Sequence, residues 1–405
     1  MMRDLSLNNS GLAAVGRIVL GALILFCGAA QGAVGRTTAP AFIRPAVVKL
    51  PIENKQDIRV VRVPLEGGSL QSRVVSIAQD LYGFLWFGTD DGLYRYDGYK
   101  FTPYRRERGN PNSLGDDAVK VVYRDRSGIL WVGTGFAGLD RLDPVSDTFQ
   151  HYRHDANNRG SLSDNSVNCI YQDAVGTLWV GTSGGLDRLD RGKGTFVHYR
   201  HNPGDNGSLS TNEVVDLFED RSGNLWVGTL GGGLNRLDRS TGRFSRFYDP
   251  DNPRSPGDDR DAALSSVRED HNGALWVGAA LGTLDPKTGS LTRYAFRSNE
   301  PGAELANVRA IHESGDGTLW IGTIKGLLVL DRERKQFVRY LKNPASSLSL
   351  HDDDILSLLE DSEGNIWVGT QSGVSRLNPK PSFTNRLYDP GDPHGHVRCP
   401  EEGIS

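Results

Sequence analysis

Glycine-rich stretches are the first residues in this sequence that could do chemistry. Leu178–Asp190 reads LWVGTSGGLDRLD, and the backbone amides of such a loop could surround a phosphate group. A phosphate-binding loop continues into Lys-Ser/Thr and the N-terminus of a helix, and neither follows here. Related stretches begin at Leu85, Leu130, Leu225, Leu275, Leu319 and Ile366. Because the stretch occurs seven times, its glycines are predicted to turn the chain rather than to bind an anion.

Acidic and histidine side chains are the next candidates for chemistry. The pair Asp90–Asp91 and the run Asp352–Asp354 could do acid–base work, although solvated loop residues are the simpler interpretation. The nine histidines include no pair at metal-ligand spacing in a loop, and no G-x-S-x-G motif is present. His312 stands where other units carry an aromatic residue, which favours a packing role. The sequence therefore predicts no catalytic residue, no metal site and no cofactor.

Composition narrows the class of partner. The chain has 405 residues, of which 46 are Lys or Arg and 50 are Asp or Glu. This near-balance provides no basic surface for nucleic acid. Three scattered cysteines are too few for a disulfide framework.

The N-terminus has the features of a signal peptide. Arg3 and Arg17 precede the apolar run 18–30, and small residues follow in a pattern suited to cleavage near residue 33. The run is shorter than the ~20 apolar residues of a spanning helix. We therefore expect a signal peptide over 1–33 and export to the periplasm, with an uncleaved inner-membrane anchor as the alternative.

The seven tryptophans reveal the organisation of the chain. Their successive spacings are 45, 48, 47, 50, 44 and 47 residues. Each unit contains four strand-like segments, which in the third unit are 166–173, 177–182, 185–190 and 195–201. Four short strands in every ~45 residues are typical of a propeller blade. The sequence predicts an all-β, seven-bladed β-propeller with four antiparallel strands per blade over 58–390, after a linker at 34–57 and before a truncated, disordered tail at 391–405.

The repeated residues then receive structural roles. The Asp after each first strand, such as Asp173, is expected to accept backbone hydrogen bonds in a turn that Gly176 closes with a positive φ. Trp179 is expected to pack between blades, and Gly181 to lie where a side chain would collide with the adjacent sheet. Two segments, 58–70 and 382–393, could each supply the strand that closes the ring, and the sequence leaves both open.

These repeats resemble those of the two-component regulator propeller family. The resemblance rests on SLSDNSVNCIYQDAVGTLWVGTSGGLDRLD and on GTDDGLYRYDGYKFTPY in the first unit, and it extends from Leu70 to about Asn378. It implies an exported sensor whose propellers precede a β-sandwich module, a membrane helix and a cytoplasmic histidine kinase or diguanylate cyclase. The chain departs from that plan because it contains only one propeller and none of the later modules.

Loops on one rim of the ring are where a ligand is expected, because loops vary while strands hold them in place. At the entry to the first strand, the units carry Arg73, Ala118, Ser166, Glu213, Ala263, Asn307 and Asp354. Two residues further they carry Val75, Lys120, Asn168, Val215, Ser265, Arg309 and Leu356. Such a mixture of charged, polar and apolar residues would suit a site for one particular ligand. It is also typical of solvated positions at which the residue type is weakly constrained. The predicted ligand-binding residues are Arg73, Asp90, Asp91, Lys120, Asn168, Glu213, Arg309 and Lys325.

The fifth unit is irregular. Asp285 lies nine positions after Trp276, whereas Asp190 lies eleven positions after Trp179. A shortened loop would leave a notch in the rim, which could admit a ligand beside Arg309 and Lys325 or could mark a decayed blade.

The leading hypothesis is an extracytoplasmic module that senses a ligand, and the family resemblance implies a carbohydrate or another small molecule. A propeller-fold hydrolase or lyase is one alternative, and a protein–protein scaffold or homodimer is another. Kinase or cyclase output domains, to which such a sensor is normally joined, are not found in this sequence.

Overall fold

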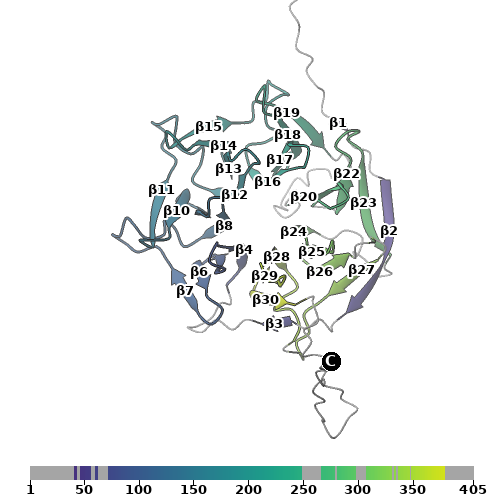
Figure 1. Ribbon diagram of the computed structural model, residues 1–405. Helices are drawn as coiled ribbons and strands as arrows, with labels where there is room; N and C mark the ends of the chain where they lie inside the picture. The colour runs from purple at the N-terminus through teal and green to yellow at the C-terminus, as the bar shows by residue number, and fades with distance from the viewer. Residues whose placement is uncertain are drawn as a thin grey trace, which may run out of the picture. The chain divides into compact units, whose positions relative to one another are not determined.

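The computed structural model describes residues 41–42, 46–55, 60–62, 72–248, 266–278, 281–297, 307–330, 333, 336–346 and 348–378. These residues contain strands and no helix, and they form the seven blades of a β-propeller (Figure 1). Each blade is an antiparallel sheet of four strands, and its first strand lies innermost, beside the central axis. The predicted fold class and blade number are confirmed.

The blades follow the chain in order. Blade one contains β4 (Val74–Gln79), β5 (Leu85–Thr89), β6 (Gly92–Tyr96) and β7 (Phe101–Tyr104), and blade two contains β8 (Val119–Arg124), β9 (Leu130–Thr134), β10 (Leu139–Asp143) and β11 (Thr148–Tyr152). Blade three contains β12 (Val167–Gln172), β13 (Leu178–Thr182), β14 (Gly185–Asp190) and β15 (Thr195–Tyr199), and blade four contains β16 (Val214–Glu219), β17 (Leu225–Thr229), β18 (Gly233–Asp238) and β19 (Arg243–Tyr248). Blade five contains β20 (Val267–Glu269), β21 (Leu275–Val277), β22 (Gly282–Leu284) and β23 (Leu291–Arg297), and blade six contains β24 (Val308–Glu313), β25 (Leu319–Thr323), β26 (Gly326–Leu330) and β27 (Phe337–Tyr340). Blade seven contains β28 (Ile355–Glu360), β29 (Ile366–Thr370), β30 (Gly373–Leu377) and the N-terminal β3 (Val60–Arg62).

A strand from the N-terminal part of the chain completes the last blade. β3 pairs antiparallel with β30, in the register Val60 to Leu377, and the Val60 side chain is fully buried. Of the two candidate closing segments, the earlier one therefore fills this position. The other, 382–393, lies outside the described residues, as do the expected signal peptide and tail.

The segment expected to be a linker also contains strands. β1 (Ala41–Phe42) pairs parallel with β19, and β2 (Ala46–Lys55) pairs parallel first with β23 and then with β27. Residues 41–55 therefore add outer strands to blades four, five and six (Figure 1). Their backbone groups pair with sheet edges that the repeat itself leaves open.

Each tryptophan lies buried in the second strand of its blade, with 0–5 % of its surface exposed. Trp226 packs with Val267 and Leu275 of the next blade, as predicted. A side chain at Gly181 would place its Cβ 2.6 Å from Val214 Cγ1 of blade four, which confirms the expected close approach. Apolar clusters that span neighbouring blades therefore hold the ring together.

The repeated Asp has one role that was predicted and one that was not. Asp173 Oδ1 accepts a hydrogen bond from the Thr177 amide at 2.8 Å, and Gly176 has φ 91°, as expected for the turn. In addition, Asp173 Oδ2 accepts one from Trp179 Nε1 at 2.8 Å. The same Asp–Trp bond measures 2.7–3.0 Å in the other blades that carry the Asp. The carboxylate thus fixes both the turn and the buried indole.

Candidate functional site

A cavity of about 390 Å³ lies at the centre of the ring, between the innermost strands. All seven blades contribute to its wall through their innermost strands, which are β4, β8, β12, β16, β20, β24 and β28. In blade five the residue before β20 also contributes. The cavity is in the size range of small-molecule sites in proteins. This makes the centre of the propeller, rather than an outer loop, the candidate site.

A bulge in the innermost strands explains which residues reach the cavity. In six blades the pairing of the first and second strands skips one residue, between Val167 and Cys169 for example. The skipped residues are Val75, Lys120, Asn168, Val215, Arg309 and Leu356, and all six line the cavity. A bulge places consecutive side chains of a strand toward the same side. Six of the seven residues in the predicted variable series therefore occupy one structural position around one cavity, and the seventh, Ser265, lies outside the described residues.

Lys120 and Asn168 form a polar cluster that joins three blades. Lys120 Nζ donates to Ser166 Oγ at 2.8 Å and to Asn168 Oδ1 at 2.9 Å. Asn168 Nδ2 in turn donates to the Val214 carbonyl at 3.0 Å. Burial lowers the pKa of Lys120, while the carboxylates of Glu213 and Asp164 act in the opposite direction.

Arg309 forms an ion pair across the wall of the cavity. Its Nε lies 3.0 Å from Asp354 Oδ1 of the next blade. Burial raises the pKa of Asp354, although the guanidinium groups of Arg309 and Arg73 both act to lower it. Arg73 lies near this pair, with Nη1 3.9 Å from Asp90 Oδ2.

A second ion pair in the cavity wall was not predicted. Arg268 Nη1 donates to Asp216 Oδ2 at 2.8 Å, and the Val267 amide donates to the same oxygen at 2.7 Å. Burial raises the pKa of Asp216. Asp216 immediately follows the bulge residue of β16, and a carboxylate between the apolar residues Val215 and Leu217 was the available signal.

The structure therefore divides the eight predicted residues into two groups. Lys120, Asn168 and Arg309 line the cavity, whereas Arg73, Asp90, Asp91, Glu213 and Lys325 are not in its wall. Asp91 pairs instead with Arg105 Nη2 at 2.6 Å and with the Tyr94 hydroxyl at 3.2 Å. The expected notch in the rim lies outside the described residues, which omit 249–265 and 279–280.

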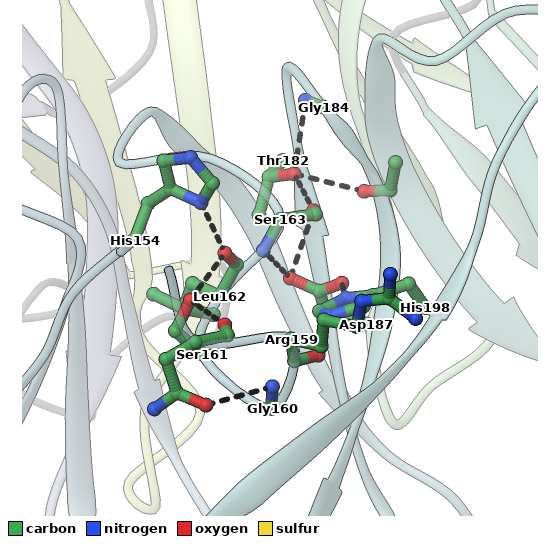
Figure 2. Close-up of polar contacts among 12 residues, drawn as sticks. His154, Arg159, Gly160, Ser161, Leu162, Ser163, Thr182, Gly184, Asp187 and His198 are labelled. Atoms are coloured by element: carbon green, nitrogen blue, oxygen red, sulfur yellow. Dashed lines mark hydrogen bonds and ion pairs between the residues drawn. The ribbon is translucent and has the colours of Figure 1, made fainter. Parts of the chain in front are cut away.

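Ser163, in the loop between blades two and three, contacts Asp187 of β14, which in turn contacts His198 of β15 (Figure 2). Asp187 is fully buried, and its Oδ2 accepts from the Ser163 amide at 2.8 Å and from Ser163 Oγ at 2.9 Å. His198 Nδ1 lies 2.6 Å from Asp187 Oδ1, and His198 Nε2 lies 2.9 Å from the Arg159 carbonyl. The Asp stands between the hydroxyl and the imidazole, so the imidazole is not placed to activate the serine.

This Asp–His pair ties the loop to the blade, and blade two repeats it. His151 Nδ1 lies 2.6 Å from Asp140 Oδ1, and the Gly115 amide donates to Asp140 Oδ2 at 2.7 Å. In blade four, Asn235 accepts from the Ser210 amide at 3.1 Å in the corresponding place. A feature that recurs at equivalent positions is structural, so we do not assign catalysis to it.

Metal-binding groups and membrane-spanning helices are both absent from the described residues. These residues contain no group of three or more His, Cys, Asp or Glu side chains positioned to hold a metal ion. They also contain no helix with the length and apolar character needed to cross a membrane.

The sequence matches the family described as "Two component regulator propeller" at residues 113–136, 161–184, 208–231 and 349–372. Histidine kinase P4 of Formosa agariphila is 37 % identical over 67 residues, which are 16 % of this chain and 5 % of that protein. Each matched segment spans the loop that enters a blade, its first and second strands and the start of the following turn.

Solved structures extend the similarity to most of the chain. The extracellular domain of BT3049 from B. thetaiotaomicron, described as a hybrid two-component system, is 26 % identical with a TM-score of 0.67. The match covers 80 % of this chain and 42 % of that one, so this chain spans less than half of the relative. Virginiamycin B lyase from Staphylococcus aureus shares the fold, with 15 % identity, a TM-score of 0.59 and coverage of 80 % and 100 %.

Proposed function

Because this chain carries the repeats of the two-component regulator propeller family, we propose that it is an extracytoplasmic sensor propeller that binds a small molecule or glycan. Its similarity to an extracellular domain of a two-component system supports a role in signalling on the outer side of a membrane. The N-terminal charged and apolar residues support export by a signal peptide. Transmission to a kinase or cyclase belongs to the same proposal.

The observation that carries the proposal is the central cavity. Six bulges bring Lys120, Asn168 and Arg309 into one wall together with the apolar Val75 and Leu356. An enclosure that combines apolar side chains with a few oriented polar groups is the usual form of a small-molecule site. Sugar rings present both apolar faces and hydroxyl groups, and this wall offers a partner for each.

Binding can be tested by following the thermal unfolding midpoint of the protein across a panel of neutral and acidic oligosaccharides. A ligand that binds the folded protein raises the midpoint. Calorimetry would then measure the affinity of the best ligand for Asn168→Ala, and we expect a loss of about tenfold. Lys193→Met, at an exposed turn far from the cavity wall, is the control and should bind normally. No midpoint shift with any sugar would contradict the proposal.

The alternatives make different predictions in the same experiments. An enzyme would convert a member of the panel to products, which chromatography would detect. A scaffold or homodimer would bind no sugar and would show a molecular mass that rises with protein concentration. The fold that this chain shares with a lyase justifies the first of these checks.

A further inference from the structure

The charges in the cavity wall are unequal. The described residues that line it include three cationic side chains, Lys120, Arg268 and Arg309, and one carboxylate, Asp216. Arg268 pairs with Asp216, and Arg309 pairs with Asp354 of the neighbouring blade. Both guanidinium groups thus have a carboxylate partner within the protein.

Lys120 differs from the two arginines. Its hydrogen-bond partners, Ser166 Oγ and Asn168 Oδ1, are neutral, and it forms no ion pair with any carboxylate of the described residues. An ammonium group has three N–H donors, and these two bonds use two of them. The third N–H remains for a ligand, and the carboxylates of Glu213 and Asp164, which favour the charged ammonium, form no ion pair with it.

The surroundings of Lys120 strengthen its attraction for an anion. Val75, Val215 and Leu356 occupy the equivalent bulge positions of other blades, so much of the wall at this level is apolar. Coulombic attraction is stronger beside such a wall than in bulk water. The neutral hydrogen-bond partners also hold the flexible lysine side chain in one place, which lowers the entropy that binding would cost.

We infer that the central cavity selects sugars that carry a carboxylate, namely uronic acids and short uronic-acid oligosaccharides, and that Lys120 Nζ is the partner of that carboxylate. This inference rests on the proposed function and adds the class of ligand to it. Ser166 and Asn168 lie beside the same ammonium group and would bind the hydroxyl groups of the sugar. The acidic ligand would complete the charge balance that Arg268 and Arg309 already have.

The test compares two ligands of the same size and linkage, α-1,4-digalacturonic acid and α-1,4-galactobiose, by calorimetry at low and high salt. We expect the acidic sugar to bind at least about tenfold more tightly, with a preference that declines as salt rises. Lys120→Met should remove most of the preference by weakening the acidic sugar far more than the neutral one, and Lys120→Arg should retain part of it. Lys193→Met, which removes an exposed lysine of the β14–β15 turn, should retain all of it.

The outcomes separate this inference from the proposed function. Equal affinity for the two sugars, or a preference that largely survives in Lys120→Met, would overturn the inference while leaving a glycan sensor intact. Inorganic sulfate that competes as well as digalacturonic acid would show a simple anion site and would overturn it too. Binding of neither sugar overturns the inference, and the wider panel then decides whether the proposed function falls with it. Near-UV circular dichroism of each variant establishes that the protein is folded.

Discussion

At the scale of single residues, buried Asp side chains form the hydrogen bonds that hold loops and histidines in place. Asp187 and Asp140 are fully buried, and each binds a loop amide on one oxygen and a histidine on the other. The carboxylate hydrogen bond raises the pKa of His198 and of His151. These contacts hold two of the loops that enter the blades, one of which leads to Lys120 and the other to Asn168.

The histidines make stability depend on pH in a definite direction. Their pKa is higher in the folded protein than the ~6.5 of an unfolded chain, so the protonated form stabilises the fold. That contribution is complete below the unfolded pKa and is lost as pH rises through the folded pKa. We expect the difference in unfolding free energy between the native protein and His151→Gln/His198→Gln to shrink between pH 5.5 and pH 8. Urea unfolding at both values measures it, and a difference independent of pH would contradict the assignment.

At the scale of elements, the turn between the first and second strands is the repeated unit of construction. Asp220 Oδ1 accepts from the Asn224 amide at 2.9 Å, and its Oδ2 accepts from Trp226 Nε1 at 2.8 Å. Blade six has Ser314 instead, which accepts from Trp320 Nε1 at 3.0 Å and donates to Asp316. Asp316 in turn accepts from the Thr318 amide at 3.0 Å. In blade six, Ser314 and Asp316 together thus accept the two hydrogen bonds that a single carboxylate accepts in the other blades.

The end of the innermost strand joins these turns to one another. A Gln or Glu there accepts a hydrogen bond from the turn amide of the preceding blade, at 2.5–3.0 Å. The bond from Ser362 to Gln79 runs from the last blade to the first. Arg124 stands at this position in blade two and cannot accept such a bond. Six junctions of the described ring therefore have the bond, and the one between blades one and two relies on other contacts.

Removing one turn carboxylate should destabilise the whole domain. In Asp220→Ala, the Asn224 amide and the buried Trp226 indole both lose their acceptor. We expect the free energy of unfolding to decrease by about 2–4 kcal/mol. Asp220→Ser retains an acceptor for the indole, as blade six does, and should cost less. Chemical denaturation measures both, and equal losses in the two variants would argue against the indole bond as a separate contribution.

At the scale of the whole molecule, the ring is closed by contacts between its first and last blades. Ser357 Oγ donates to the Val74 carbonyl at 3.1 Å, and the ring of Trp367 lies 5.8 Å from that of Phe87, centroid to centroid. β3 then supplies the outer strand of blade seven from the N-terminal part of the chain. The same segment also extends blades four to six through β1 and β2.

Closure and extension can be separated by two shortened proteins. One that begins at residue 57 lacks β1 and β2 but keeps β3, whereas one that begins at residue 64 lacks all three. Without β3 the edge of β30 is exposed and Leu377 loses its neighbour Val60. We expect the second protein to unfold at a clearly lower temperature and to aggregate, and the first to lose much less. Calorimetry and size-exclusion chromatography report both, and two similar proteins would show that β3 is dispensable.

The repeat, the seven blades, the turns and the equivalence of the variable first-strand residues could all be predicted from the sequence. These properties follow from short-range chemistry: the spacing of Trp, the Asp and Gly of each turn, and the alternation within each strand. Lys120, Asn168 and Arg309 could be found in this way because equivalent residues of a repeat occupy equivalent places.

The tertiary structure decided which segment closes the ring, which predicted residues share a cavity, and how the buried charges pair. Closure joins residues 283 positions apart, and Arg268 reaches Asp216 from a strand 52 residues further along the chain. No local pattern encodes such contacts, because each depends on two blades that meet only once the ring has formed. The strand bulge connects the sequence repeat to the site, because the bulge residues of six blades line the cavity.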